Sequence, residues 1–327
     1  MPYFFRGPFL IMIAAMLWAL DGLLRSQLTA SIPSTAIVFY EHLVGFVLLL
    51  PFFWRALPKV KTLHRADWFR LILLTIVSSV LGTILFTEAF ARSAVSYDFI
   101  TPTLLQKLQP VFVVLLSAIL LRERVTWRFI GLAILALVGS YMVTFGSESV
   151  SLSWSGKEIV FLLSIGAALA WGSGTILSKK ILEKLSFSEA TSLRFLLAIP
   201  ISAIAMLTLN HGYSPVEISG ASWLRFVAIG LTTGAAAILI YYRGLRITPA
   251  KVSTFAELMF PVTSILIAVT ALNPFGAPQP ISFGQGLGIL ILIVSILLIG
   301  TSELPAPKVK ESEAYEGATQ SEPVSTT

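Results

Sequence analysis

The chain contains 327 residues, of which 56% are hydrophobic and only 12% are charged, and its mean hydropathy is +0.85. A water-soluble fold of this size could not bury so much apolar surface, so the composition excludes a soluble globular protein and predicts a membrane protein. The sequence has no cysteine, which excludes disulfide scaffolds, thiolate metal sites and cysteine nucleophiles. The net charge is +6, but the basic residues lie in short clusters between apolar runs. This pattern is typical of membrane topology, and we expect no nucleic-acid partner.

Apolar runs of about 20 residues are long enough to cross the hydrocarbon core of a bilayer. The first run follows Arg6 in "MPYFFRGPFLIMIAAMLWALDGLL", which has no small-residue cleavage site, and we interpret it as a retained span. We predict ten spans, at residues 8–28, 34–54, 68–90, 98–121, 127–146, 157–179, 188–209, 222–245, 250–272 and 282–302. The tail, residues 303–327, is rich in Pro, Ser and Glu without apolar periodicity, and we predict that it is disordered.

The Lys and Arg residues between the spans indicate orientation, because cytoplasmic loops are enriched in them. Most of them fall on one side of the predicted spans, in clusters at residues 55–70, 122–128, 179–184 and 243–251. The connections on the other side hold Arg92, Lys157 and Arg225. We therefore predict a multi-pass protein of the cytoplasmic (inner) membrane with both termini and the tail in the cytoplasm.

The two halves of the chain resemble each other in order. "AAMLWALDGLL" (14–24) aligns with "AALAWGSGTIL" (167–177), and without a gap this register places Glu41 on Arg194. "WFRLILL" (68–74) aligns with "WLRFVAI" (223–229), and "LQPVFVVLLSAIL" (108–120) aligns with "MFPVTSILIAVTA" (259–271). Last, "IGLAILALV" (130–138) resembles "LGILILIVS" (287–295). Ordered matches of Trp, Pro and Gly are more than the general likeness of apolar helices, so we predict two repeats, at residues 8–146 and 157–302.

Each predicted repeat holds five spans, an odd number, so the second repeat must enter the membrane from the opposite face. The two repeats would then be related by a pseudo-two-fold axis in the membrane plane. This is the architecture of alternating-access transporters, whose binding site lies near the midplane where the repeats meet. The fold class predicted is thus an all-α membrane protein with ten transmembrane helices in two inverted five-helix repeats.

Several of these motifs resemble those of a known family. They are "AAMLWAL" and "AALAWGS" in the first span of each repeat, the matched prolines of the fourth spans, and "LLRERVTWRFIGLAIL" at 120–135. Together they resemble EamA-type members of the drug/metabolite transporter superfamily over residues 8–302. The resemblance implies ten helices, inverted repeats, a central cavity and export or exchange of small metabolites.

Ionisable side chains inside a span cost about 2.5–3.5 kcal/mol at mid-membrane, so each needs a partner, a cavity or an exit. Asp21 and Arg25 are spaced i,i+4, as are Glu88 and Arg92, and this spacing predicts an ion pair within each set. Both pairs lie near the outer ends of their spans. They either neutralise each other at the membrane rim or take part in substrate binding or gating, and the sequence leaves both alternatives open.

Aromatic and proline residues at matched depths are further candidates. Trp18 and Trp171 lie midway along their spans, where they either pack between helices or form walls for an organic solute. Pro110 and Pro261 each remove a backbone hydrogen bond, and we interpret them as kinks that form a pocket or hinge. His42 is either a proton carrier or, the favoured alternative, a buried hydrogen-bonded histidine.

Lys107 lies well inside the predicted fourth span, too deep for easy access to the interface. We hypothesise that Glu41 meets Lys107 and that Arg194 meets Glu257 across the cavity wall, where a zwitterionic substrate or a proton could reach them. The alternative is a purely structural role for the same pairs. The candidate substrate-binding or coupling residues are Trp18, Asp21, Glu41, His42, Glu88, Gln106, Lys107, Trp171, Arg194 and Glu257, with Pro110 and Pro261 as hinges.

The sequence contains no recognisable nucleophile–base arrangement, metal-ligand cluster or phosphate loop, and "GSGTILSK" (172–179) lacks P-loop spacing. We therefore expect no enzyme activity, no cofactor and no metal. We predict a secondary transporter, either an exporter or an exchanger, of a small polar or amphipathic metabolite, with an amino-acid-like solute favoured. Its partners are the small-molecule substrate and membrane lipid, and a homodimer is an open alternative. The other function classes kept are a flippase for a lipid-linked sugar or similar amphiphile and an intramembrane enzyme or structural protein.

The charge distribution makes the topology testable. Reporter fusions at Lys61, at Lys184 and in the C-terminal tail are expected to report the cytoplasm, and a fusion at Gly276 is expected to report the outside. The measurement is the paired activity of alkaline phosphatase and green fluorescent protein reporters at each site. A cytoplasmic signal at Gly276 would show that a span has been miscounted.

Overall fold

The computed structural model of the chain describes residues 6–29, 31–95, 102, 105–146, 158–209, 218–272, 277–278 and 280–303. All regular secondary structure in these residues is helical, which confirms the all-α prediction for the described part. The predicted tail begins at Glu303, but this residue ends the last helix, Phe283–Glu303, and forms an ion pair with Lys251, so the prediction of disorder is wrong for Glu303. Residues 304–327 and the reporter site at Gly276 lie outside the described residues.

Nine helical stretches within the described residues are long and apolar enough to cross a membrane. They are Arg6–Thr29, Ser34–Val60, Arg65–Arg92, Trp127–Phe145, Glu158–Ile181, Phe187–Leu209, Gly220–Arg246, Ala250–Ala268 and Phe283–Glu303. The predicted fourth span is represented by a shorter apolar helix, Gln109–Leu120, because most of residues 96–104 lies outside the described part. A tenth full span therefore stays a prediction.

Several spans are built from more than one helix. In the first half the elements are α1 (Arg6–Ala19), α2 (Asp21–Thr29), α3 (Ser34–Val60), α4 (Arg65–Leu74), the π-helix η2 (Thr75–Leu81), α5 (Gly82–Val95), α7 (Gln109–Leu120) and α8 (Trp127–Phe145). In the second half they are α9 (Glu158–Ile181), α10 (Phe187–Leu209), α11 (Gly220–Leu231), α12 (Ala235–Arg246), α13 (Ala250–Ala256), α14 (Met259–Ala268) and α15 (Phe283–Glu303).

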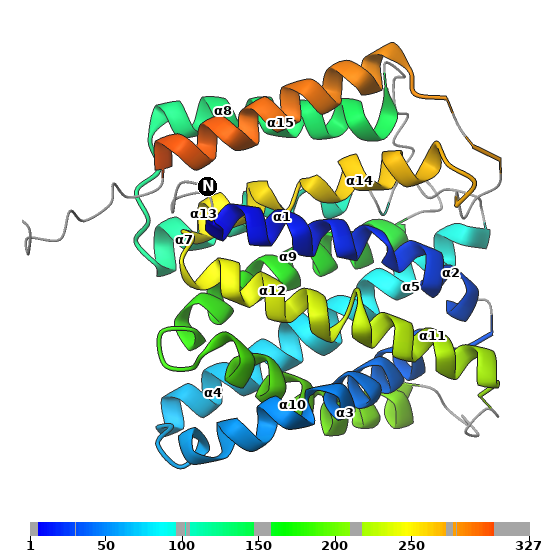
Figure 1. Cartoon of the computed structure of the whole chain (residues 1–327), viewed down its shortest axis with the longest axis vertical. Coiled ribbons are helices and arrows are strands. Elements are labelled where there is room, and N and C mark those ends of the chain that lie inside the picture. Colours follow the sequence, from blue (N-terminus) through cyan, green and yellow to red (C-terminus); the bar gives the residue numbers. More distant parts are fainter. Residues whose placement is uncertain are drawn as a thin grey trace, which may run out of the picture.

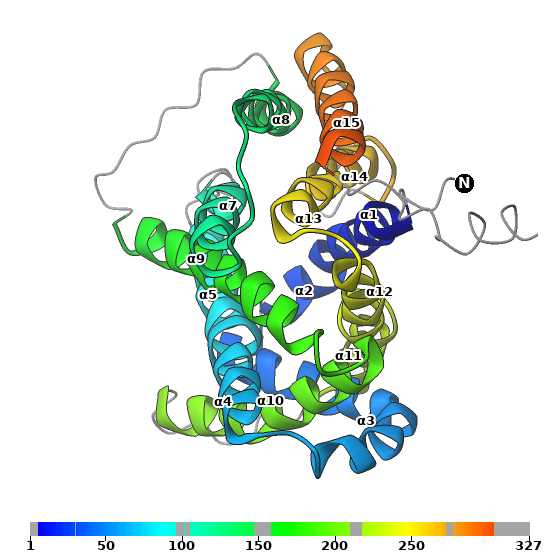
Figure 2. The same ribbon diagram turned by 90° about the vertical axis from the view of Figure 1, so that its left-hand side faces the viewer.

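The first helix of each half packs against the other half, and the helices that it contacts there occupy equivalent positions in the two halves. The first helix of the first half, α1, packs against α12, α13 and α14 of the second half, and the first helix of the second half, α9, packs against α5 and α7 of the first. The helices of the second spans, α3 and α10, contact each other, as do the last helices of the two halves, α8 and α15 (Figure 1). Figure 2 shows α5, α7 and α9 forming one side of the molecule, and α1, α12, α13 and α14 forming the other.

Helices are interrupted at matched positions in the two halves. Residues 107–108 before Pro110 and residues 257–258 before Pro261 form turns between helical segments. Proline has no N–H and its ring clashes with the carbonyl four residues earlier, so a helix cannot run straight through either site. The third spans are interrupted as well, by η2 in the first half and by a turn at residues 232–234 in the second. In that turn the Gly234 N–H reaches back five residues to the Ile229 carbonyl, a π-type bond of 2.7 Å, and such bonds mark functional sites in many helices.

The α8–α15 pair approaches closely through glycine. A Cβ atom at Gly139 of α8 would lie 2.9 Å from the Leu292 nitrogen, and one at Gly288 of α15 would lie 2.7 Å from the Val143 nitrogen. Close backbone contacts of this kind are a usual basis of helix association in lipid. Lipid tails are as apolar as the helix surfaces, so no hydrophobic force drives the helices together.

We expect Gly139→Ala and Gly288→Ala each to destabilise the protein by about 1–3 kcal/mol, because the added methyl group forces the two backbones apart. Gly131 and Gly286 lie on the same two helices with nothing within 4 Å of an added Cβ, so Gly131→Ala and Gly286→Ala are the matched controls. The measurement is thermal unfolding of the detergent-solubilised protein. Equal melting temperatures for all four variants would contradict the close helix contact.

Candidate functional site

A cavity of about 490 Å³ lies between the two halves of the molecule. Its lining includes eleven of the twelve candidate binding, coupling or hinge residues: Trp18, Asp21, Glu41, His42, Gln106, Lys107, Pro110, Trp171, Arg194, Glu257 and Pro261. Glu88 is not among the lining residues. Its side chain is 36% exposed and pairs with Arg92 at 2.8 Å, so the structure places this pair away from the cavity.

Two aromatic pairs form opposite walls of the cavity. Trp18 of α1 packs against Tyr241 of α12 with ring centroids 5.2 Å apart, and Trp171 of α9 packs against Phe86 of α5 at the same separation. The sequence repeat places Trp18 on Trp171, and the register of the third spans places Phe86 on Tyr241. Each pair therefore joins the first span of one half to the third span of the other. Tilted aromatic faces of this kind suit a flat organic ligand.

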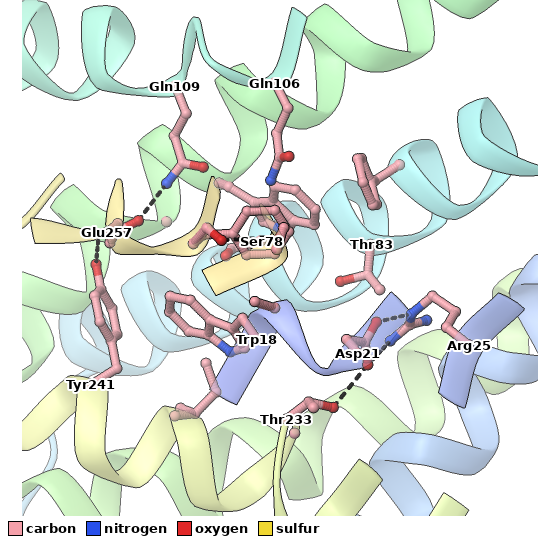
Figure 3. A pocket seen from close by; sticks show the side chains of 18 of the residues that line it. Trp18, Asp21, Arg25, Ser78, Thr83, Gln106, Gln109, Thr233, Tyr241 and Glu257 are labelled. Atoms are coloured by element: carbon pink, nitrogen blue, oxygen red, sulfur yellow. Dashed lines mark hydrogen bonds and ion pairs between the residues drawn. The ribbon is translucent and has the colours of Figure 1, made fainter. Parts of the chain in front are cut away.

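Arg25 of α2 is the centre of a buried acidic network. Its guanidinium forms an ion pair with Asp21, as the i,i+4 spacing predicts, and a second ion pair of 2.7 Å with Glu41 of α3. Asp21 also accepts a hydrogen bond of 2.8 Å from Thr233, in the turn between α11 and α12 (Figure 3). The network thus ties two helices of the first half to the interrupted third span of the second half.

His42 has a structural hydrogen bond. Its Nδ1 donates to the Val38 carbonyl at 2.7 Å, and its ring packs against Phe195 with centroids 5.0 Å apart. Both contacts agree with the favoured alternative of a buried hydrogen-bonded histidine.

Arg194 of α10 is held by hydroxyl groups. Its guanidinium donates to Tyr242 at 2.7 Å, to Ser78 at 3.0 Å and to Ser79. Ser78 and Ser79 lie in the π-helix η2, so this node ties the second span of one half to the interrupted third span of the other. Among the described residues no carboxylate lies within ion-pair distance of Arg194. The predicted contact between Arg194 and Glu257 is therefore wrong.

Glu257 is bound by neutral donors at the interruption before Pro261. Its carboxylate accepts a hydrogen bond of 2.8 Å from the Tyr241 hydroxyl and one of 2.9 Å from the Gln109 amide (Figure 3). Gln109 belongs to α7 of the first half, so Glu257 also joins the halves. The predicted contact between Arg194 and Glu257 failed because the position of a residue along its span does not determine which neighbouring helix its side chain faces.

Lys107 lies in the turn before α7, and its ammonium sits 4.8 Å from the centroid of the Phe260 ring. It forms no ion pair or hydrogen bond within the described part of the chain, and Glu41 is bound to Arg25 instead. The predicted contact between Glu41 and Lys107 is therefore wrong. The physical reason is that Arg25 already neutralises Glu41, whereas the Lys107 ammonium faces the Phe260 ring instead.

The end of the molecule that carries most basic residues is held together by polar contacts. The Lys179 ammonium donates to the carbonyls of Leu245 and Thr248, each at 2.6 Å. The Glu123 carboxylate accepts the N–H groups of Ala250 and Lys251 at 2.7 and 3.0 Å, which satisfies the free donors at the start of α13. These contacts join the ends of α9, α12 and α13 and the α7–α8 connection.

Several residues of the site were not identified from sequence. The serines of η2 and Gln109 contact the predicted residues, but uncharged side chains inside a span carry no signal alone. Phe86 could have been found, because the repeat register places it on Tyr241.

The charges of the cavity are balanced. The lining holds three basic and three acidic side chains: Arg25, Lys107, Arg194, Asp21, Glu41 and Glu257. A net-neutral, partly aromatic cavity suits a neutral or zwitterionic organic ligand. The described residues contain no group of three or more His, Asp or Glu side chains that could hold a metal ion.

Comparison with curated proteins finds transporters along nearly the full chain. The riboflavin transporter ImpX of Fusobacterium nucleatum is 33% identical over 298 residues, which cover 90% of this chain and 97% of that protein. An uncharacterized transporter of Synechocystis is 24% identical over 84% of this chain and 78% of its own length. One of Methanothermobacter thermautotrophicus is 22% identical over 88% and 84% of the two chains.

The fold also occurs among solved structures. One protein crystal structure superposes with a TM-score of 0.68 over 90% of this chain and 96% of its own, at 16% sequence identity, which shows a shared fold. The model of the EamA-like transporter family matches twice, at residues 5–145 and 158–301. The chain is a multi-pass membrane protein, and it belongs to the EamA-like transporter family.

Proposed function

We propose that this protein is a secondary transporter of riboflavin or a closely related neutral flavin. The observation that carries the proposal is the net-neutral cavity between two repeat-matched aromatic pairs. Riboflavin combines a flat heteroaromatic ring system with a polyol chain, so it needs aromatic walls and hydrogen-bonding groups but no net charge. The cavity volume lies within the range of pockets that hold ligands of this size. The relative named a riboflavin transporter supports the same substrate.

A flavin fits the cavity better than the amino-acid-like solute favoured by the sequence. That preference relied on two ion pairs that a zwitterion could open, Glu41 with Lys107 and Arg194 with Glu257. In the structure Glu41 is bound to Arg25 and Glu257 to neutral donors. Opening the Arg25 network would leave charges unpaired in a low dielectric, which costs several kcal/mol.

We infer that transport follows alternating access between two inverted five-helix repeats. The matched exchange of packing partners between the halves supports an inverted relation. The matched interruptions of the third and fourth spans supply places where the helices can bend. The Lys179 and Glu123 contacts would seal the cytoplasmic end in the conformation described. The sequence shows no nucleotide-binding loop, so the driving force would be a solute or ion gradient, and its sign would set the direction.

The test is counterflow of radiolabelled riboflavin in proteoliposomes that contain the purified protein. Vesicles preloaded with unlabelled riboflavin are expected to accumulate the label transiently, whereas vesicles without protein are not. Label that stays outside in every case would overturn the proposal. Parallel vesicles with labelled amino acids, or with a fluorescent lipid at fixed composition, separate a flavin transporter from the amino-acid transporter and the flippase.

The Arg25 network predicts a distinctive order of variants. Arg25→Leu leaves two carboxylates without a cation, and we expect it to destabilise the protein by about 3–5 kcal/mol and to abolish counterflow. Arg25→Leu combined with Glu41→Leu leaves Asp21 bound to Thr233 and is expected to be more stable than the single variant. The control is Arg92→Leu, at the exposed pair with Glu88, which is expected to cost under about 1 kcal/mol. Thermal unfolding in detergent gives the order, and a double variant less stable than Arg25→Leu would contradict the network.

A further inference from the structure

Most polar groups that line the cavity already have hydrogen-bond partners. Within the described residues, three buried side-chain atoms have none: Gln106 Oε1, Ser140 Oγ and Thr254 Oγ1. Gln106 and Thr254 line the cavity, and Thr254 is 1% exposed. A buried polar group without a partner is costly, and each such group in a native protein needs an explanation. A ligand that supplies the missing partner is the simplest explanation for an unpaired group on a residue that lines a cavity.

Lys107 adds an unused donor beside the unused acceptor. It follows Gln106 directly in the chain, and both residues line the cavity at the interruption before Pro110. The Phe260 ring face attracts the ammonium but accepts no ordinary hydrogen bond, so its three N–H donors remain available. Figure 3 shows Gln106 and Gln109 extending from the same segment, with the Gln109 amide directed to Glu257.

The matched interruption of the other half is different. The proline register places Gln106 on Glu257 and Lys107 on Leu258. The Glu257 carboxylate is bound by Tyr241 and Gln109. In contrast, within the described residues the Gln106 oxygen has no hydrogen-bond partner, and the Lys107 ammonium contacts the Phe260 ring without a hydrogen bond or ion pair. The unused acceptor and donor therefore lie on one side of the cavity, on adjacent residues.

We propose that Gln106 and Lys107 together recognise an imide edge of the substrate, a ring N–H flanked by carbonyl groups. The Gln106 oxygen accepts the ring N–H, and the Lys107 ammonium donates to an adjacent carbonyl. The aromatic pairs Trp18–Tyr241 and Phe86–Trp171 hold the ring system that carries this edge. The inference rests on the proposed function, because the isoalloxazine ring of riboflavin has such an edge, with its ring N–H at N3. It also extends that function to a chemical class, fused heteroaromatic rings with an unsubstituted imide.

The test is a binding cycle that combines ligand and protein changes. Purified protein in nanodiscs is titrated with riboflavin and with N3-methylriboflavin, and the quenching of flavin fluorescence gives each Kd. For the native protein we expect the methylated ligand to bind about 10–100-fold more weakly, because the methyl group removes the donor and leaves the glutamine oxygen unpaired. In Gln106→Leu this ratio is expected to fall to within about threefold of one. Gln106→Met is the second variant, and size-exclusion chromatography shows whether each variant is folded.

Two further variants give different expected patterns. Lys107→Met is expected to weaken both ligands by a similar factor, about tenfold or more, because both keep the carbonyl group. Gln109→Leu is the matched control: its amide is bound to Glu257, so the ratio of the two Kd values should stay at the native value whatever the change in affinity.

The outcomes separate the inference from the function. If the native protein binds riboflavin but the folded Gln106 variants keep the native ratio, the imide recognition is overturned and the flavin transporter is not. If the native protein binds neither ligand, the proposed function is overturned and this inference falls with it. The inference is supported if the ratio of the two Kd values falls toward one in the Gln106 variants and stays at the native value in Gln109→Leu.

Discussion

A guanidinium group inside a membrane protein must be surrounded by acceptors, and the rest of this structure depends on how two arginines meet that constraint. Arg25 is neutralised by Asp21 and Glu41, whereas Arg194 is held by the hydroxyls of Ser78, Ser79 and Tyr242. An isolated charge in low dielectric would cost far more than the fold can spare, so these contacts decide which helices must stay together. Each arginine network connects a second span of one half, through Glu41 or Arg194, to the third span of the other half near the interruption of that third span. The contacts that compensate the charges therefore also hold the cavity walls together.

The helix interruptions and the contacts of the two arginines involve the same helices. A π-helix or a proline break leaves backbone groups without helical partners, and in a membrane such groups are tolerated only where protein or a cavity satisfies them. The breaks before Pro110 and Pro261 lie beside the cavity and bring Lys107 and Glu257 to its wall. A straight helix at these positions would direct the same side chains elsewhere. The polar character of the cavity is therefore a consequence of helix interruption as much as of residue choice.

Nine of the ten predicted spans coincide with long apolar helices of the described residues, because run length and hydropathy are local properties of the sequence. The Asp21–Arg25 and Glu88–Arg92 pairs were predictable for the same reason, since i,i+4 spacing lies within one helix. Contacts between helices were not predictable, because they depend on helix rotation and tilt. Glu41 and Lys107 both lie inside predicted spans, yet Glu41 faces Arg25 and Lys107 lies in a turn. The serines that bind Arg194 had no signal, because their role comes entirely from what they contact.

The two halves supply a symmetric scaffold, and their differences supply the chemistry. Matched aromatic pairs form two walls of the same kind, and such walls alone would accept many flat solutes. Selectivity then requires positions where the halves differ, and the cavity has them: Glu41 matches Arg194, Gln106 matches Glu257, and Lys107 matches Leu258. A substrate with an asymmetric polar edge can use such differences. At the break before Pro261 the carboxylate is already hydrogen-bonded, whereas at the break before Pro110 the hydrogen-bonding groups are unused. A site with identical polar groups at both breaks would bind a substrate in two equivalent orientations, whereas under the proposed function the unequal breaks of this cavity would favour one.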